Sequence, residues 1–185
     1  MDRIKQGDNP SFRSLIESYE RLVFHVVCRM VPNTADQEDL CQDVFLKVYT
    51  HIHDFRFECR LSTWIASIAY NRCINFLQKK KASLYLDHSR REHLEFASGI
   101  ENRPDHEVER EDIAARLHEA IAQMDVPYRT ILTLYHLEEM EYAEIAQIMG
   151  MPEGTVKSYL FRARQKLKAA VFSKYKKEEI WAANT

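Results

Sequence analysis

The sequence predicts an all-α protein made of two small helical domains joined by a flexible linker, the second containing a helix-turn-helix. Apolar residues recur at intervals of three and four along most of the chain, which is the period of amphipathic helices. The 185 residues include only four glycines and five prolines, too few for a turn-rich β sandwich. A hydrophobic fraction of 45% is enough to build one or two compact cores.

Three helices are expected in the first half of the chain. The apolar stripe of the first helix runs through residues 12–30, and Pro32 ends it. Thr34 is the expected N-cap of the second helix, because a glutamine follows three residues later in the capping-box pattern. Ser62 is the expected N-cap of the third helix, which runs to the lysine cluster at Lys79.

An acidic, aperiodic segment separates the two halves. From Ser83 onwards the helical period fades while serine, proline and acidic residues accumulate, and the period resumes at Ile113. The sequence therefore predicts one domain over residues 8–94, a linker over 95–112 and a second domain over 113–174. Basic residues are concentrated on both sides of this linker. Charge alone favours solvated helix faces, and a polyanion partner needs support from a motif and from geometry.

Residues 141–168 have the pattern of a helix-turn-helix. Ala146 is small enough for close helix packing, Gly150 supplies the left-handed residue at the turn, and Pro152 prevents the first helix from continuing. In the second helix, Val156, Leu160, Ala163 and Leu167 cluster on one side at about 100° per residue.

The opposite side of this second helix indicates DNA binding. It presents Ser158, Phe161, Arg162 and Gln165. A major-groove helix can place phenylalanine against a thymine methyl group and arginine on the acceptor atoms of guanine, whereas a solvated face favours a polar residue over phenylalanine. Thr155 and Lys157, near the start of the helix, are candidates for phosphate or base contacts.

The chain resembles the small extracytoplasmic-function (ECF) group of bacterial sigma factors. In the second half the resemblance is carried by Tyr142-Ala-Glu-Ile-Ala, Gly154-Thr-Val-Lys-Ser and Phe161-Arg-Ala-Arg, which are similar to the minus-35 recognition domain. In the first half it is carried by Asp36-Gln-Glu-Asp-Leu-Cys-Gln-Asp-Val-Phe and Leu61-Ser-Thr-Trp-Ile-Ala-Ser-Ile-Ala-Tyr-Asn. Together the matches cover most of residues 10–172. The resemblance implies a factor that binds core RNA polymerase and directs initiation at promoters by recognising minus-35 and minus-10 elements.

The resemblance also implies partners and contact residues. Core RNA polymerase is expected to bind through its β′ clamp and β flap, and an anti-sigma factor is an expected further partner. The second helix corresponds to the surface that docks on the clamp, with Asp39, Leu40, Asp43, Phe45 and Lys47 as candidates. Leu40 and Phe45 are equally well explained as core residues.

Minus-10 recognition is implied for the loop from Phe55 to Leu61, which in the family receives a flipped base of the non-template strand. Phe55 and Asn71 fall at positions implied in contacting that strand, and an aromatic ring offers a stacking surface to an unpaired base. Nearby basic side chains are expected to follow the strand's backbone: Arg72, Lys79 and Lys80. Trp64 shares a helix face with Asn71 and is equally well explained by packing.

Other function classes have less support. A helix-turn-helix regulator that acts without polymerase would not need the first-half pattern. No Gly-rich phosphate loop, serine nucleophile elbow or H-E-x-x-H motif indicates an enzyme, so no cofactor or catalytic residue is predicted. His51, His53 and Cys59 lack a fourth partner at close spacing, so no metal site is predicted. Without a signal or membrane-spanning pattern, the expected location is the cytoplasm, with reduced cysteines and no membrane insertion.

Overall fold

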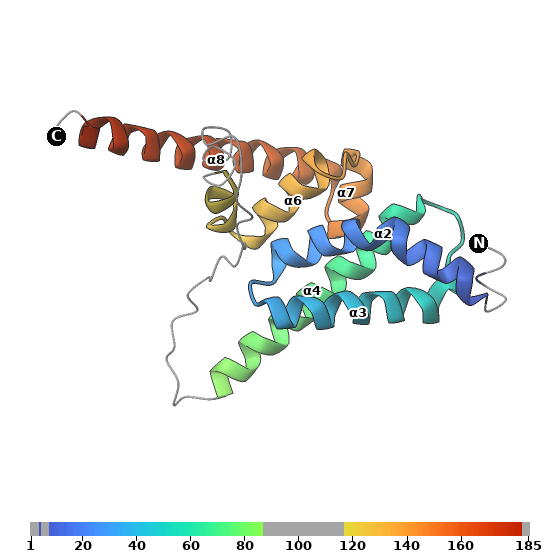
Figure 1. Ribbon diagram of the computed structural model, residues 1–185. Helices are drawn as coiled ribbons and strands as arrows, with labels where there is room; N and C mark the ends of the chain where they lie inside the picture. The colour runs from blue at the N-terminus through green and yellow to red at the C-terminus, as the bar shows by residue number, and fades with distance from the viewer. Residues whose placement is uncertain (1–3, 5–7, 87–116, 183–185) are drawn as a thin grey trace.

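The computed structural model describes residues 8–86 and 117–182 together with Ile4. Within the described residues every regular element is a helix, which confirms the expected all-α fold (Figure 1). The predicted linker over 95–112 lies outside these residues. In the part of the chain that the structure describes, no helix has both the length and the apolar character needed to cross a membrane.

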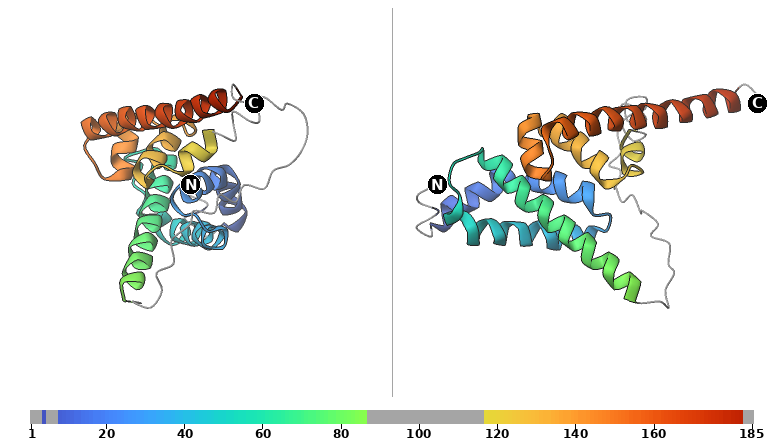
Figure 2. Two further views of the ribbon diagram at one scale, coloured as in Figure 1. Left: turned by 90° about the vertical axis from the view of Figure 1, so that its left-hand side faces the viewer. Right: turned by 180° about the vertical axis from the view of Figure 1, so that it is seen from behind.

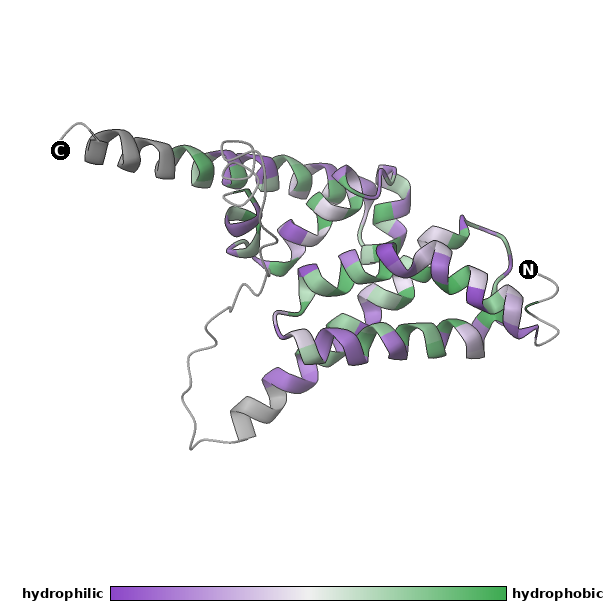
Figure 3. Cartoon of the chain, in the orientation of Figure 1, coloured by the Kyte–Doolittle hydropathy of each residue, from purple (hydrophilic) through white to green (hydrophobic). Residues whose placement is uncertain are grey.

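Three mutually contacting helices form the N-terminal half: α2 (Asn9–Met30), α3 (Thr34–His51) and α4 (Leu61–Leu86). A short 3-10 turn, η1 (Ile52–Asp54), follows α3. Apolar residues at helical spacing form a shared core. Figure 3 shows that hydrophobic and hydrophilic residues alternate along these helices. The fully buried members of this core include Val23, Val26, Val27, Val44, Val48, Ile65, Ala69 and Cys73.

The starts of two helices differ from the sequence prediction. Asn33, not Thr34, caps α3, because its side-chain oxygen accepts a hydrogen bond from the Asp36 amide at 3.0 Å. Asparagine is at least as good an N-cap as threonine, so the earlier residue takes this position. Ser62 is not the cap of α4, since the helix already begins at Leu61. This helix also continues beyond the predicted end at Lys79.

The C-terminal half contains the predicted helix-turn-helix. Residues 117–122 are helical, and α6 (Val126–His136), α7 (Tyr142–Met149) and α8 (Glu153–Ala182) follow. Gly150 ends α7 with a left-handed backbone at φ 64°, as its place in the turn predicts. Val156, Leu160 and Ala163 are buried, so α8 packs with the predicted side inwards.

The two halves also contact each other. Helix α2 packs against α6, and α4 packs against α7, while α8 extends beyond the rest of the fold (Figures 1 and 2). Arg129 of α6 is 4% exposed, and its guanidinium donates hydrogen bonds to the carbonyls of Ala122 at 2.9 Å and Met30 at 3.2 Å. Met30 is the last residue of α2, where the helix dipole favours a cation. The two halves that the sequence predicts as separate domains thus share an interface, and Arg129 is buried in it.

Candidate nucleic-acid interface

The outer face of α8 is open to solvent. Ser158, Phe161, Arg162 and Gln165 are all exposed, as the sequence predicts, and the Phe161 side chain is 63% exposed. The turn at Gly150 and the buried side of α8 fix the helix on the core. The exposed face can therefore contact a ligand without a conformational change. An exposed phenylalanine beside an arginine has the chemistry to contact thymine and guanine edges in a major groove.

The start of α8 is held by local pairs. Lys157 forms an ion pair with Glu153 at 2.8 Å, which raises the pKa of Lys157, and its ammonium lies 5.3 Å from the centre of the Tyr142 ring. Thr155 is half-buried. A phosphate that approaches Lys157 must therefore compete with the Glu153 carboxylate.

A pair of stacked tyrosines lies beside this helix. The rings of Tyr135 and Tyr142 are 5.2 Å apart, and the Arg164 guanidinium lies 5.0 Å from the Tyr135 ring centre. Hydrogen bonding with Tyr142, followed by hydrogen bonding with Arg164, lowers the pKa of Tyr135, and hydrogen bonding with Tyr135 raises the pKa of Tyr142. The sequence analysis did not single out this cluster, because no periodicity relates residues on α6, α7 and α8.

The candidate minus-10 residues occupy different environments. Asn71 and Lys79 are exposed, Trp64 is half-buried, and Phe55 is only 4% exposed. The Phe55 ring packs 4.8 Å from Phe57 and 5.4 Å from Trp64, measured between ring centres. Phe55 must therefore move before it can stack on a base, and its role stays a prediction.

Phe57 is the exposed ring that the sequence analysis missed. Its side chain is 62% exposed, and its backbone has φ 59°, a left-handed conformation that non-glycine residues rarely adopt. Strained backbone of this kind is concentrated at functional sites. The sequence could have indicated Phe57, because it is a second aromatic residue two positions after Phe55 in a segment without helical spacing.

Two of the candidate cations are paired with acids of α3. Arg72 forms an ion pair with Asp43, and Lys80 forms one with Asp36 at 3.0 Å. The four side chains are each between 30% and 39% exposed, so water weakens these pairs. A pocket between α3 and α4 is lined by Asp36, Asp39, Leu40, Asp43, Arg72, Asn75, Phe76 and Lys79. The structure thus places candidate DNA-binding and polymerase-binding residues side by side.

The candidate polymerase residues do not all face solvent. Asp39 is exposed, whereas Leu40 is 7% exposed and belongs to the core, as its alternative explanation predicted. Phe45 is partly buried against the same core. Lys47 is half-buried and lies 3.5 Å from the His51 ring.

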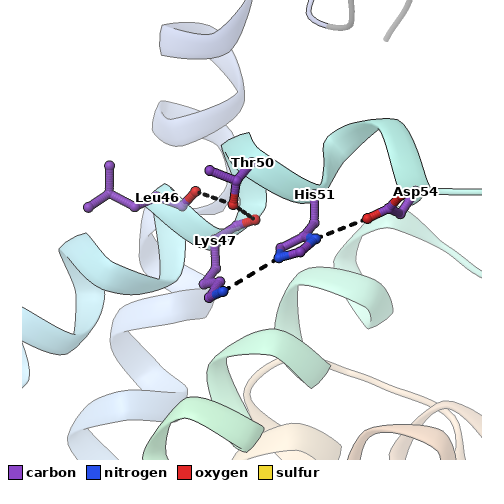
Figure 4. A network of polar contacts seen from close by, with 5 residues as sticks. All are labelled: Leu46, Lys47, Thr50, His51 and Asp54. Atoms are coloured by element: carbon purple, nitrogen blue, oxygen red, sulfur yellow. Dashed lines mark hydrogen bonds and ion pairs between the residues drawn. The ribbon is translucent and has the colours of Figure 1, made fainter.

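Leu46 and Tyr49 are exposed apolar residues of α3 that the sequence analysis missed, at 64% and 40% exposure. With Asp39 and Gln42 they lie along one exposed helix face. Figure 4 shows Leu46 one residue before Lys47, whose contacts with His51 and on to Asp54 lie at the end of α3. Leu46 and Tyr49 lie outside the apolar stripe that predicts the buried side of this helix, and this position in the sequence could have indicated that they are exposed.

All four cysteines are free thiols. Burial raises the pKa of Cys28 to about 11 and that of Cys73 to about 12. Among the residues that the structure describes, no three histidine, cysteine or acidic side chains are grouped in a way that could hold a metal ion.

Comparison with known proteins agrees with this geometry. Residues 15–83 match the family model for sigma-70 region 2, and residues 114–167 match that for sigma-70 region 4. The chain is 30% identical to the ECF RNA polymerase sigma factor SigW of Bacillus subtilis, over 90% of this chain and 91% of that protein. It is 31% identical to the ECF RNA polymerase sigma-E factor of Escherichia coli, over 89% of this chain and 88% of that protein.

Two solved structures share the fold. One is the sigma factor RpoE of Bartonella quintana, in complex with the anti-sigma factor NepR, with a TM-score of 0.70 and 19% identity over 87% of this chain and 96% of that one. The other is CnrH in complex with the cytosolic domain of CnrY, with a TM-score of 0.65 and 18% identity over 93% and 94% of the two chains. Because both sigma-70 regions are present in order, the alternative of a regulator that acts without polymerase is not favoured. The chain belongs to the ECF sigma factors of the sigma-70 family.

Proposed function

We propose that this protein binds core RNA polymerase and directs transcription initiation at promoters that it recognises through their minus-35 and minus-10 elements. The observation that carries the proposal is the presence of sigma-70 regions 2 and 4 in order along one chain. The exposed face of α8 supports it independently, because that face has the residues of a major-groove reading helix.

For the minus-35 element we assign the exposed face of α8. Phe161 and Arg162 contact base edges, Ser158 and Gln165 flank them, and Thr155 and Lys157 meet phosphates or bases near the start of the helix. Loss of one good base contact costs about 1 to 3 kcal/mol and relaxes the preference at one base pair.

For the minus-10 strand we assign Asn71 of α4 and the aromatic loop before that helix. Phe57 is the ring accessible to an unpaired base; it packs against Phe55, which in turn packs against Trp64. Arg72, Lys79 and Lys80 contact the phosphates of the strand. Arg72 and Lys80 can do so only after their ion pairs with the acids of α3 break. Stacking on one base is worth about 1 to 3 kcal/mol.

For polymerase binding we assign the exposed side of α3. Asp39, Asp43 and Lys47 provide polar contacts to the β′ clamp, and Leu46 adds an exposed apolar contact, whereas Leu40 and Phe45 support the helix from the core. The β flap is the expected contact of the second domain, over 113–174. That domain and the first, over 8–94, are joined by the linker 95–112. An anti-sigma factor is a further proposed partner, because relatives of this fold are held by such proteins. The protein acts in the cytoplasm with polymerase and needs no catalytic group of its own.

In vitro transcription with core polymerase and a promoter library tests this function. Added chain is expected to produce defined start sites that core polymerase alone does not use. Arg162→Ala and Phe161→Ala are expected to alter the minus-35 preference with normal thermal melting. Arg13→Ala, which changes an exposed arginine on α2, is the matched control. Start sites that do not depend on the chain would contradict the proposal.

A further inference from the structure

The pocket between α3 and α4 lies beside residues that are assigned above to the phosphates of the minus-10 strand. Its volume is about 290 Å³, at the lower end of the range for small-ligand sites. A space of this size suits a single flat ring better than a larger ligand. On the α4 side the pocket is lined by Arg72, Asn75, Phe76 and Lys79, and on the α3 side by Leu40 and three aspartates.

Two cations of α4 stand at opposite ends of this lining. Arg72 and Lys79 are seven residues apart, which separates them by about 10 Å along the helix axis. Asn75 and Phe76 lie midway between them on the same helix. Lys79 is exposed and forms no ion pair within the described ranges, so it is available to a phosphate. Phosphates on either side of one nucleotide that meet these two cations place its base at the pocket.

The residues between the two cations have the chemistry to bind a base. The Phe76 ring is partly buried against the core, and Leu40, at 7% exposure, continues the apolar surface on α3. An aromatic ring of this kind offers a stacking surface to an unpaired base. Asn75 is exposed, and its side chain has no hydrogen-bond partner among the residues that the structure describes. Its amide both donates and accepts, which matches the amino group and ring nitrogen at an adenine edge.

The charges on the α3 side favour one kind of base. Asp36 and Asp43 are paired with Lys80 and Arg72, whereas Asp39 is exposed and forms no ion pair in the part of the chain that the structure describes. An ionised carboxylate only accepts hydrogen bonds, so its field attracts the amino group of adenine, cytosine or guanine. Thymine has no amino group and presents two carbonyl oxygens, which the same field repels.

We propose that the pocket between α3 and α4 binds one unpaired base of the minus-10 strand that carries an amino group, with Asn75 on the edge of the base and Phe76 against its ring. This inference rests on the proposed sigma-factor function and adds a second base site to it. Asn75 lies about 21 Å along α4 from Leu61, where the helix begins next to the loop that contains Phe57. One base cannot occupy both places, so the pocket and the loop contact different positions of the strand.

Asn75→Ala tests the pocket without emptying the core. Asn75 is exposed within α4, and alanine is the better helix former, so folding is expected to be unchanged. Gln78→Ala is the matched control, because it removes the same amide group from an exposed position of α4 that does not line the pocket. Circular dichroism and thermal melts check that both variants fold as wild type does.

The complex of the full-length protein with core polymerase is titrated with thymine oligonucleotides that carry one adenine, moved by one position at a time. In wild type, adenine at one position is expected to tighten binding about three- to tenfold over the all-thymine strand, and Asn75→Ala is expected to abolish this gain. The gain is expected to persist in Gln78→Ala. It is also expected to persist in Phe57→Ala, whose binding is weaker overall, because Phe57 does not line the pocket.

A second arm separates a strand from a free nucleotide, which offers the same base. Excess dAMP is expected not to displace the oligonucleotide, because its single phosphate cannot meet Arg72 and Lys79 together. Displacement by dAMP at the concentration at which the strand binds would make the pocket a site for free nucleotides and would overturn its assignment to the strand.

The remaining outcomes separate the pocket from the sigma-factor function. If the wild-type complex initiates transcription and binds the strand, but no adenine gain depends on Asn75, the pocket assignment is wrong and the function stands. An adenine gain that Phe57→Ala abolishes and Asn75→Ala leaves intact would assign base recognition to the loop alone. If wild type neither binds core polymerase nor directs transcription, the proposed function fails, and the assignment of the pocket to a promoter strand fails with it.

Discussion

The surfaces assigned to the two promoter elements differ in how ready they are to bind. On α8 the residues assigned to the minus-35 element are exposed, and a buried stripe on the other side of the helix anchors them. On α4 and its preceding loop, Phe55 is buried and both Arg72 and Lys80 are paired with acids of α3. The surface proposed for duplex DNA is therefore preformed, whereas residues of the surface proposed for a single strand are engaged in contacts within the protein.

This difference matches the two forms of DNA. The minus-35 element is read as an intact duplex, so a rigid helix face can dock without ordering cost. The minus-10 strand becomes available only when the duplex opens. Acids that neutralise Arg72 and Lys80 reduce attraction to duplex DNA before that step, since affinity for phosphates increases with each free cation.

The largest expected effect separates two rings of the same loop. Phe55→Ala is expected to cost about 3 to 5 kcal/mol of unfolding free energy, because it empties a buried site between Phe57 and Trp64. Phe57→Ala is expected to leave stability nearly unchanged and to weaken single-strand binding by about 1 to 3 kcal/mol. Urea unfolding and binding of the polymerase complex to a minus-10 oligonucleotide measure the two effects. Equal loss of stability in both variants would assign Phe57 to the core.

Neighbouring residues on α8 give the corresponding contrast in the second half. Leu160 is 1% exposed, so Leu160→Ala is expected to cost about 2 to 5 kcal/mol of unfolding free energy. Phe161→Ala is expected to change unfolding by no more than about 0.5 kcal/mol while altering minus-35 preference. Thermal melts and the promoter library separate the two. A stable Leu160→Ala variant would contradict the packing of α8.

The sequence predicted the structure well where apolar residues recur with the helical period and poorly where they do not. The buried and exposed sides of α8 follow from residues spaced at three and four, and the structure confirms them. Phe55 and Phe57 lie in a segment with no period, so their burial depended on tertiary packing. The position of Arg129 at the interface could not be predicted either, because a polar residue in a periodic helix is normally placed at the surface.

Partly or fully buried thiols make the N-terminal half sensitive to alkaline pH, since all four cysteines lie before the linker. Burial raises the pKa of Cys28 to about 11 and that of Cys73 to about 12. The folded protein therefore holds protons that the unfolded chain releases near pH 9, and this contribution to stability is present below pH ~9 and is lost as the pH rises towards ~11.

The rate of cysteine alkylation reports the raised thiol pKa values directly. At pH 8 the thiolate fraction is about a hundredfold smaller for Cys28 than in the unfolded chain and about a thousandfold smaller for Cys73, so iodoacetamide is expected to modify the two thiols of the native protein more slowly by about these factors. Peptide mass mapping with and without urea gives the ratio for each thiol. Comparable rates in both conditions would show that these cysteines are open to solvent.

The smallest effect concerns the ion pair between Asp36 and Lys80. Asp36→Asn removes the carboxylate that holds Lys80 at 3.0 Å and leaves the amide that the Asn33 cap uses. The pair is half-exposed and worth about 1 kcal/mol or less, so the free energy of unfolding is expected to change little. The released lysine is expected to strengthen binding of the polymerase complex to a minus-10 single strand by up to about fivefold and to steepen the salt dependence by about 0.7. Glu38→Gln, an exposed acid on the same helix, is the matched control. An unchanged salt slope in Asp36→Asn, with normal folding, would mean that Lys80 does not meet the strand, and the difference between the two surfaces would then rest on Arg72 and Phe55.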